Sequence, residues 1–424
     1  MSKRVLILSA SAGAGHTRAA QALEQAFAQR NDVQDVRHED ALQYTSPAFR
    51  SFYSRAYIDM VNRAPGVLGW LYDYADKPWK DESRRLMIDR LNAIPLINAL
   101  RNYKPDTVVC THFLPSEIMS WLICRRAIQA KHAVVVTDFD VHAMWLCRHV
   151  SRYFVAMDET KVHLEQLGFN PDRITTSGIP VDPAFAIAKD KVEMRHKLGI
   201  EPDRPTILLS AGGFGVGPIE QIVRSVMTIK HQAQILAMCG RNEELRNTLN
   251  ALNENNQSNV LVKAVGYTTE MDEYMAASDI VLGKPGGLTT SEALTKGLVF
   301  VIVNPIPGQE ERNADHLLEE GAGIRCNNLP TMGYKIDKLL ADTDKFQQMK
   351  GNALRLSRAF AARDIANTMI TERMPDPRLV ALLQSKHSCD TMPERVMRAT
   401  RKTARKISNR QIKPKLIEQR DQAK

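Results

Sequence analysis

Short apolar runs alternate with longer amphipathic segments over the first half of the chain. The run Val5–Leu8 is followed by Thr17–Gln29, whose apolar residues fall on one helical face. Three further runs, Thr107–Cys110, Ala133–Phe139 and Arg152–Met157, are apolar over most of their length, as the strands of a buried parallel sheet are. The alternation predicts strands and helices in turn, and therefore an α/β fold with a parallel sheet.

The same pattern begins again after a stretch that contains Pro and Gly, Thr175–Phe185. The strands predicted in this second half are Thr206–Ser210, Gln234–Met238, Val260–Val265, Asp279–Leu282 and Val299–Val303. Two such blocks predict two doubly wound, Rossmann-like domains that face a cleft, with ligands at the carboxyl ends of the strands. We place the N-terminal domain at residues 1–178, the C-terminal domain at 179–375 and a tail at 376–424.

A glycine loop joins the first predicted strand to the first predicted helix in SASAGAGHTRAAQAL, Ser9–Leu23. The backbone N–H groups of such a loop and the positive end of the helix dipole favour an anion, although the loop could be a tight turn alone. No Lys-Ser or Lys-Thr follows the glycines, which excludes a Walker loop, and Arg18 replaces the third glycine of a dinucleotide fingerprint. His16 adds a titratable group, and a neutral imidazole near a helix N-terminus suits a general base.

Further glycine loops follow strands of the second half, GGFGVG at Gly212–Gly217 and LGKPGGLTTSEAL at Leu282–Leu294. Three hydroxyl side chains are candidates for capping the helix that starts in the second loop: Thr289, Thr290 and Ser291. Glu292 is expected in the first turn of that helix, where it either compensates the dipole or binds ribose hydroxyls. The segment Asn304–Leu317 places amide and carboxyl groups at another helix start: Gln309, Glu310 and Asn313. Together these turns predict a nucleotide-sugar pocket.

Charge is concentrated at the C-terminal end of the chain. The 424 residues carry a net charge of +9, and residues 386–424 hold twelve Lys or Arg against four Asp or Glu, which is +8 of that excess. The remaining sequence is close to neutral, so we expect no nucleic-acid binding by the folded body. The tail is interpreted as a solvated disordered segment or an amphipathic membrane helix, with nucleic-acid binding as a weaker third option.

Two other features bear on the compartment. The six cysteines form no CxxC pair, which argues against a zinc ribbon or a disulfide framework and indicates a reducing compartment. No apolar run approaches the ~20 residues of a membrane span. The N-terminal apolar run is shorter than the ~7–15 residues of a signal peptide core. We therefore expect a cytoplasmic protein and interpret Val5–Leu8 as a strand.

The stretch 49–79 departs from the α/β pattern. It contains eight aromatic residues and several cations: Phe49, Phe52, Tyr53, Tyr57, Trp70, Tyr72, Tyr74 and Trp79, with Arg50, Arg55, Arg63 and Lys77. Aromatic rings interleaved with cations suit a membrane interface, where the rings are buried and the cations meet headgroups. The alternative is a helical excursion that packs against the domain.

An ordered set of motifs resembles the GT-B glycosyltransferases of the monogalactosyldiacylglycerol synthase and processive diacylglycerol glucosyltransferase family, which are glycosyltransferase family 28-like. In the first half these motifs are SASAGAGHTRAAQAL, THFLPS and VVVTDFDVHAMW. In the second half they are LLSAGGFGVG, VGYTTEMDEYMAASDIVLGKPGGLTTSEAL and PGQEERNADHLLEEGAG, of which the last two are the most specific. The resemblance covers about residues 3–370.

The resemblance implies that the N-terminal domain takes a lipid acceptor and the C-terminal domain a UDP-sugar. On the donor side, Glu292 would hold the ribose, and Gln309 and Glu310 would meet the hexose. The residues implied at the phosphates are Gly286, Gly287, Leu288 and Thr289, with Gly213, Phe214 and Gly215 facing phosphates and sugar. Gly266 and Tyr267 would frame the uracil. On the acceptor side, the implied residues are Gly15, His16, His112, Asp138, His142 and Trp145.

The mechanism expected from this site is an inverting transfer without a metal ion or other cofactor, the UDP-sugar being a co-substrate. A base takes the proton of the acceptor hydroxyl, and amides and helix dipoles stabilise the departing UDP. The DFD motif at Asp138–Asp140 has the spacing of a metal-binding Asp-x-Asp, but it lies on the acceptor half. We expect His16 to be the base, with Asp138 as second candidate. Asp138 and His142 could instead be a helix cap and a packed histidine.

The function expected is transfer of a hexose from UDP-glucose or UDP-galactose to diacylglycerol or a related lipid. The partner implied is an anionic membrane surface, and the location is cytoplasmic, peripherally at the inner face of the cell membrane. Alternatives are transfer of N-acetylglucosamine to a polyprenyl-linked acceptor and a UDP-sugar epimerase. An NAD-dependent oxidoreductase is disfavoured by the broken fingerprint.

Overall fold

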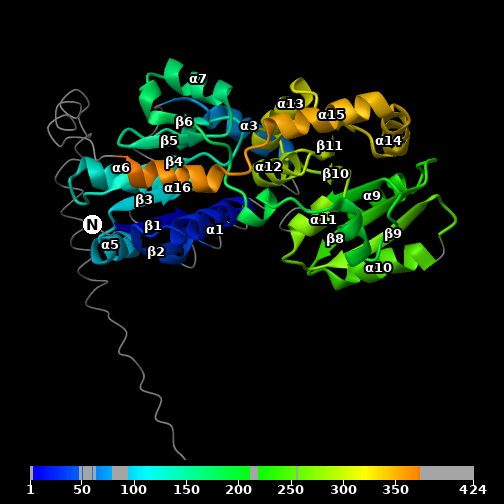
Figure 1. Ribbon diagram of the computed structural model, residues 1–424. Coiled ribbons are helices and arrows are strands. Elements are labelled where there is room, and N and C mark those ends of the chain that lie inside the picture. Colours follow the sequence, from blue (N-terminus) through cyan, green and yellow to red (C-terminus); the bar gives the residue numbers. More distant parts are fainter. Residues whose placement is uncertain are drawn as a thin grey trace, which may run out of the picture. The chain divides into compact units, whose positions relative to one another are not determined.

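Two six-stranded parallel sheets form the framework of the protein. The computed structural model describes residues 3–46, 50, 60, 64–78, 94–210, 218–254 and 256–372 (Figure 1). The strands of the first sheet are β1 (Lys3–Ser9), β2 (Val33–Asp40), β3 (Thr107–Cys110), β4 (Lys131–Val135), β5 (Arg152–Val155) and β6 (Ile174–Thr176). Their spatial order is β2-β1-β3-β4-β5-β6, so the chain winds outward in both directions from the β1–β3 pair.

Helices connect the strands of the first sheet. The described ones are α1 (Ala14–Ala28), α3 (Pro65–Ala75), α5 (Ile94–Tyr103), α6 (Phe113–Cys124) and α7 (Asp158–Gln166), with short 3₁₀ turns η1 (Ala41–Tyr44), η2 (Ala143–Trp145), η3 (Pro171–Arg173) and η4 (Pro183–Ala186). The α1 helix buries Leu23 and Phe27 against Val5 and Ile7 of β1. The expected helix was Thr17–Gln29, so its N-terminus lies earlier than the pattern indicated.

Two strand expectations for this half need correction. The β4 strand ends at Val135, whereas the apolar run predicted a strand to Phe139. Residues beyond Val136 leave the sheet and lead into the site described below. The β2 strand was not predicted, since only Val33 and Val36 of its eight residues are apolar. As an edge strand paired only to β1, β2 does not need the continuous apolar run of a central strand.

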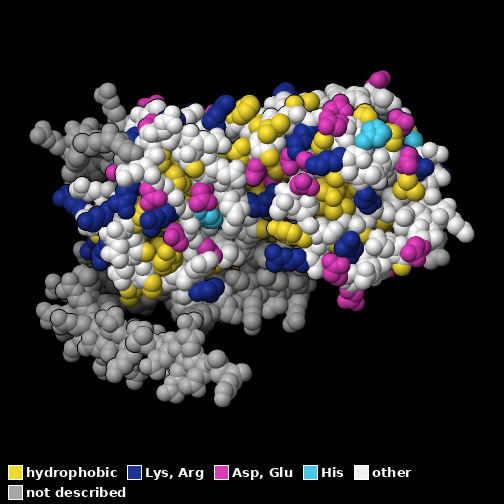
Figure 2. Space-filling view, turned by 60° about the horizontal axis from the view of Figure 1, so that its bottom comes forward, with side chains coloured by type: hydrophobic (Ala, Val, Ile, Leu, Met, Phe, Trp, Pro, Cys, Tyr) yellow, Lys and Arg dark blue, Asp and Glu magenta, His cyan; other side chains and the backbone are white. Residues whose placement is uncertain are grey.

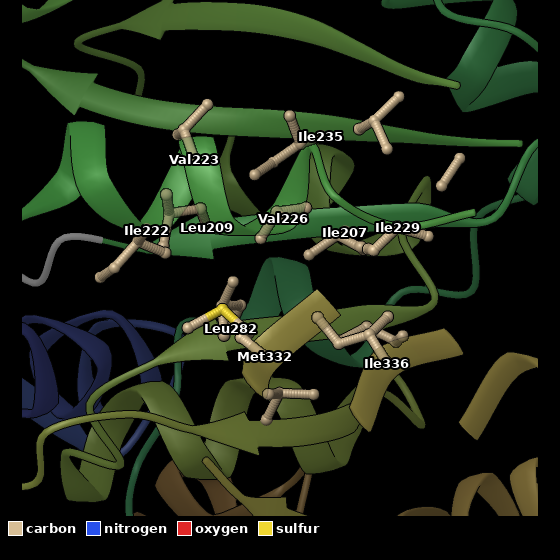
Figure 3. Packing of buried hydrophobic residues seen from close by; sticks show 14 of the residues in the cluster. Ile207, Leu209, Ile222, Val223, Val226, Ile229, Ile235, Leu282, Met332 and Ile336 are labelled. Carbon is tan, nitrogen blue, oxygen red and sulfur yellow. The ribbon is translucent and has the colours of Figure 1, made fainter. Parts of the chain in front are cut away.

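The second sheet is built in the same way. Its strands are β7 (Thr206–Ser210), β8 (Ala233–Gly240), β9 (Val260–Gly266), β10 (Ile280–Gly283), β11 (Val299–Ile302) and β12 (Gly323–Arg325), in the spatial order β12-β11-β10-β7-β8-β9. Strand side chains such as Ile207, Leu209 and Ile235 meet those of the covering helices, among them Val223 and Met332, in a closely packed core (Figure 3). The five strands predicted here are all present, with shifts of one or two residues at their ends.

The helices of the second half are α8 (Lys191–Lys197), α9 (Ile219–Val226), α10 (Glu243–Glu254), α11 (Met271–Ala276), α12 (Gly287–Thr295), α13 (Gln309–Glu319), α14 (Met332–Ala341), α15 (Thr343–Leu356) and α16 (Ala361–Thr371), with the 3₁₀ turn η5 (Leu329–Thr331). The last of them, α16, packs on α1 of the first half, with Ile365 and Met369 in the core around Val5 (Figure 1). Lys3 and Lys131 donate from Nζ to carbonyls at its C-terminal end, where cations are favoured.

Among the described residues on the face shown in Figure 2, basic and acidic side chains are interspersed. This distribution agrees with a nearly neutral folded body. None of the helices in the described part of the chain is long and apolar enough to cross a bilayer. The domain boundaries at residues 178 and 375 stay a prediction, and the basic tail at 376–424 lies outside the described residues.

Candidate active site

The first half has a candidate ligand position at its topological switch point, between β1 and β3. The carboxyl ends of β1 and β3 lie side by side there, with Leu8 next to Cys110, and the chain leaves these two strands in opposite directions. Ligands of doubly wound sheets bind at such a switch point. The loop after β1 leads to His16, and the turn after β3 contains Thr111 and His112.

His16 lies in the first turn of α1 and is held by two oxygens. Its Nδ1 is 3.1 Å from the carbonyl oxygen of Thr111 and 2.8 Å from Oγ1 of Thr137. Because a carbonyl can only accept, Nδ1 carries the hydrogen, and the lone pair of the neutral ring is on Nε2. Burial lowers the pKa of His16 to about 4, although the Thr111 carbonyl works against this. His16 is therefore a neutral imidazole with an unprotonated Nε2 at neutral pH.

Aromatic rings surround His16, and two of them belong to residues implied on the acceptor side. The His112 ring lies edge-on at 4.7 Å between centroids, and the Trp145 ring is 6.2 Å away. His112 caps α6, because its Nδ1 accepts from the backbone N–H of Leu114 at 3.1 Å. Burial and the neighbouring His16 hold the pKa of His112 well below its usual value. The structure thus brings His16, His112 and Trp145 together in an apolar setting that favours uncharged rings.

Asp138 lies just beyond β4 and is joined to the second half through Asn313. Burial raises the pKa of Asp138 to about 6, although a hydrogen bond from Asn313 opposes the shift. The Asn313 side chain is fully buried, accepts from the N–H of Phe139 at 2.9 Å and donates to the carbonyl of Pro285 at 3.0 Å. Both ends of this amide are therefore engaged, so Asn313 connects the two halves and does not offer its amide to a sugar.

His142 has a structural place, as the alternative interpretation of a packed histidine expected. Its Nδ1 accepts from the N–H of Met144 at 3.1 Å, and its Nε2 donates to the carbonyl of Tyr72 at 2.9 Å. The side chain is 2% exposed, and its ring lies 4.1 Å from that of Tyr72. His142 therefore joins α3 to the turn η2 and keeps one tautomer.

The second half has its switch point between β7 and β10, where the two remaining glycine loops begin. The strands approach closely, since a Cβ on Gly283 would lie 2.7 Å from the carbonyl oxygen of Ser210. The loop that follows β7 contains Gly213, Phe214 and Gly215, and these three predicted donor residues lie outside the described residues. The loop that follows β10 leads through Gly286 into α12.

The start of α12 touches the His16 site. A Cβ on Gly287 would lie 2.1 Å from the carbonyl oxygen of Thr137, the residue whose hydroxyl meets His16. One on Gly15 would lie 3.7 Å from Cβ of Leu288. The structure therefore places the predicted diphosphate turn, including Thr289, directly beside the predicted base. The absence of a side chain at Gly287 is what permits this approach.

Two expectations about α12 are wrong. Its N-cap is Gly286, without a side-chain hydrogen bond, so the three hydroxyl residues do not cap the helix. Thr290 is a fully buried residue of the helix, and Ser291 donates from its hydroxyl to the carbonyl of Gly287 at 2.9 Å. Glu292 is the sixth helical residue and is outside the first turn, so it does not compensate the dipole. The helix thus begins earlier than expected, with Gly286 as its N-cap and Gly287 as its first residue.

Glu292 instead pairs with the first half. Its carboxylate is 1% exposed and lies 2.5 Å from Nη2 of Arg18 on α1. Burial raises the pKa of Glu292 to about 7, and the Arg18 charge limits that rise. From the sequence, Arg18 was noted only because it replaces the third glycine of a dinucleotide fingerprint. Its pairing with Glu292 was missed, because no local pattern indicates a partner 274 residues away.

The other predicted donor residues follow strands of the second sheet. Tyr267, after β9, is 65% exposed and lies under the guanidinium of Arg241 at 5.0 Å, while Gly266 ends that strand. Glu310 in the first turn of α13 is buried, and its Oε2 accepts from the N–H of Ile306 at 2.7 Å. Burial raises the pKa of Glu310 to about 7. A Cβ on Gly286 would lie 3.8 Å from Oε1 of Glu310, so this carboxyl group adjoins the diphosphate turn, with Gln309 beside it in sequence.

Comparison with known proteins shows the family to which this chain belongs. Residues 16–181 match the monogalactosyldiacylglycerol (MGDG) synthase family, and residues 206–369 match the C-terminal domain of glycosyltransferase family 28. A processive diacylglycerol β-glucosyltransferase of Staphylococcus aureus (strain Newman) is 30% identical over 371 residues, which are 86% of this chain and 92% of that relative. The chain belongs to this family of diacylglycerol glycosyltransferases. The resemblance stated from the motifs is confirmed, and so is the enzyme class.

Solved structures bear on the fold of this glycosyltransferase. MurG of Acinetobacter baumannii superposes with a TM-score of 0.55 at 14% identity, covering 88% of this chain and 100% of MurG. A UDP-GlcNAc 2-epimerase of Neisseria meningitidis, bound to UDP-GlcNAc, gives a TM-score of 0.56 at 14% identity, with 88% and 100% covered. At such identities the likeness concerns the fold alone. The predicted class, a GT-B fold with two doubly wound sheets, is confirmed.

Proposed function

We propose that this glycosyltransferase moves a hexose from UDP-glucose or UDP-galactose to diacylglycerol, with inversion and without a metal ion. The observation that supports this most is the contact between the two switch points. The neutral His16 ring and the N-terminus of α12 are joined through Thr137, which touches both. A base and an anion-binding turn that share one neighbour suit the attack of a hydroxyl on a sugar diphosphate.

In the proposed reaction, Nε2 of His16 takes the proton of the acceptor hydroxyl as the oxygen attacks the sugar. Nδ1 stays bonded to the Thr111 carbonyl, which supports the positive charge that the ring gains. The bond from sugar to diphosphate breaks, and UDP leaves with its charge facing the first N–H groups of α12, from Gly287 to Thr289. Asp138 remains the second candidate for the base. Its raised pKa also suits proton transfer near neutral pH.

For the donor we propose that Glu292 accepts from the ribose hydroxyls, and that Tyr267 and Gly266 frame the uracil. The support is the exposed Tyr267 ring at the carboxyl edge of the sheet and a buried carboxyl group whose pKa is near 7. Arg18 must release Glu292, at least in part, when ribose binds. Gln309 and Glu310 are proposed at the hexose, and Gly213, Phe214 and Gly215 at the phosphates.

We propose that the acceptor comes from an anionic membrane, with α3 at the lipid surface. One face of this helix exposes four large apolar side chains: Val67 (54%), Trp70 (63%), Leu71 (38%) and Tyr74 (51%). Trp70 and Tyr74 stack at 5.5 Å, and the ammonium of Lys77 lies 5.0 Å from the Tyr74 ring. Exposed aromatics with a neighbouring cation fit the boundary between acyl chains and headgroups. The protein would then act peripherally at the cytoplasmic face of the membrane.

The experiment is incubation with UDP-glucose or UDP-galactose, with and without vesicles that contain diacylglycerol, followed by mass spectrometry of the lipids. We expect UDP release that depends on the lipid, and a hexosyl lipid of β configuration. Interconversion of UDP-sugars without lipid would support an epimerase, and transfer of N-acetylglucosamine to a polyprenyl carrier would support the other alternative; either result contradicts the proposal. Activity retained in a metal chelator tests the metal-independent step.

A further inference from the structure

The inward face of α3 rests on the turn that starts α13. A Cβ on Gly69 would lie 2.7 Å from Cβ of Pro307, and one on Gly308 would lie 2.6 Å from Cδ1 of Tyr72. Gly308 also has a φ of +93°, a region that side chains rarely adopt. Two glycines, one from each half, thus allow the helix to pack against Pro307 and Gly308. This face is opposite to the face that exposes Trp70.

Arg312 in α13 fastens this contact with a bridge to two carboxylates. Its Nη2 donates to Oδ2 of Asp76 at 2.6 Å, and its Nη1 donates to Oδ2 of Asp140 at 2.8 Å. The guanidinium also lies over the Tyr72 ring, 5.3 Å from its centroid. Asp76 follows the last residue of α3, and Asp140 lies two residues after Asp138. One side chain therefore joins α13, the end of α3 and the loop of the second candidate base.

The loop that follows Asp138 makes further hydrogen bonds to α3 and to Asp76. Oδ1 of Asp76 accepts from the N–H of Ala143 at 2.8 Å, and His142 donates to the Tyr72 carbonyl. Although burial of Asp76 works against it, the Arg312 guanidinium and the Ala143 N–H hold the pKa of that carboxyl group below its usual value. Burial works against the charge of Arg312 too, but the hydrogen bond to Asp76 and the other acidic neighbours raise the pKa of Arg312 above its usual value. Arg312 and Asp76 are therefore both charged at neutral pH.

The same turn of α13 also faces the donor side. Glu310 adjoins Gly286 at the diphosphate turn, and Asn313 donates to the carbonyl of Pro285 just before it. Residues 310, 312 and 313 thus contact the donor loop, α3 and the loop of Asp138 within four positions. A displacement of α3 or of that loop would change where the acceptor meets the donor.

We propose that Arg312 is a positioning residue for transfer, which holds the lipid-facing helix α3 and the loop 138–145 at a set distance from the donor loop. It acts through Asp76 and Asp140 and does not touch the reacting atoms. This inference rests on the proposed function, because it takes α3 as the side from which the lipid enters. The planar fork of arginine is required, since a lysine ammonium cannot donate to two carboxylates in the fixed geometry of the guanidinium.

The test is to compare R312Q and R312K with R325Q. Arg325 is a matched control because it too faces two carboxylates of α13, Glu311 at 3.6 Å and Asp315 at 3.9 Å. With diacylglycerol in vesicles, we expect R312Q to lower kcat about 10- to 100-fold, the range that misplacement of reacting groups produces. R312K should not restore it, whereas R325Q should stay within about twofold of the wild type. UDP affinity, measured by calorimetry, should change less than about threefold in all three variants, because the donor contacts remain.

Several outcomes separate this inference from the proposed function. If the wild type transfers no hexose to diacylglycerol, the proposed function fails. If the wild type is active and R312Q behaves like R325Q, the positioning role is wrong. A parallel loss of UDP affinity and thermal stability in R312Q would show a merely structural role and would also overturn it. Should R312Q not fold, D76N retains the Arg312–Asp140 bond, and a selective fall of kcat with unchanged UDP affinity is expected there too.

Discussion

Burial shifts the pKa of His16 in the first half and the pKa values of two carboxyl groups in the second half in opposite directions. In the first half, burial lowers the pKa of His16 to about 4, so the ring is neutral at neutral pH. In the second half, burial raises the pKa of Glu292 and of Glu310 to about 7. Both shifts favour the uncharged form, as desolvation does for any ionisable group. The comparison shows how one physical effect leaves an unprotonated imidazole on one side and carboxyl groups that titrate near neutral pH on the other.

The largest expected effect comes from removing the base of the first half. H16A should lower kcat about 10²- to 10⁴-fold, the usual contribution of a positioned general base. The matched control is H132N. His132 is also buried, its Nδ1 lies 3.0 Å from the His149 carbonyl, and burial lowers its pKa to about 4. This control should reduce thermal stability and leave kcat largely intact. Equal losses of kcat in both variants would remove the special role of His16.

The next effect concerns the carboxyl group of the second half. E292Q keeps the shape of the side chain and removes its charge, so we expect donor KM to rise about 10- to 100-fold, as for loss of a hydrogen bond to a charged group. The comparison variant is E320Q, whose carboxylate pairs with Arg355 at the surface at 2.8 Å. Steady-state kinetics with varied UDP-sugar measure the change. An unchanged KM in E292Q would contradict the ribose role.

The pH dependence distinguishes the two candidate bases. A base is active when unprotonated, so kcat should be retained as pH falls until its pKa is crossed, and then drop about tenfold per pH unit. With His16 as base the fall begins near pH 4, and with Asp138 as base it begins near pH 6. We expect the former, with donor KM changing near pH 7 as Glu292 and Glu310 titrate. A limb near pH 6 that disappears in D138N would assign the base to Asp138.

The smallest effect is expected at the exposed face of α3. The double variant W70S/Y74S should weaken binding to anionic vesicles about 5- to 10-fold, since it removes two interfacial rings. Activity on a short-chain acceptor in solution should be unchanged. Y334S is a suitable control, because Tyr334 is an aromatic residue of α14 that is 70% exposed. Co-sedimentation with vesicles measures the binding, and equal loss in the control would argue against α3 as the lipid surface.

Much of the framework could be predicted because its signals are local. Central strands such as β3 and β7 are continuous apolar runs, and the glycine loops follow them directly. The edge strand β2 was harder to predict from the sequence, because it is only partly buried and carries charged residues. His16 and His112 lie beside each other because they follow β1 and β3, the two neighbouring strands at the switch point of the sheet. The loops after such strands are expected to meet.

The partners of the site residues could not be predicted in the same way. Arg18 and Glu292 are 274 positions apart, and Arg312 and Asp76 are 236 apart. Their pairing depends on how the two halves pack. The backbone partners of Asn313 and His142 could not be predicted for the same reason, because each partner lies on a distant segment. The return of α16 to the first half depends on the same packing.

The sequence by itself determined the two doubly wound sheets, the glycine turns at their strand ends and the family of the protein. These features depend on apolar periodicity and motif spacing, which are local properties of the chain. Only the tertiary structure decided which ionisable groups are neutral and which are bridged. The physical reason is that a pKa and an ion pair depend on burial and on neighbours in space, and these are set when distant segments come together.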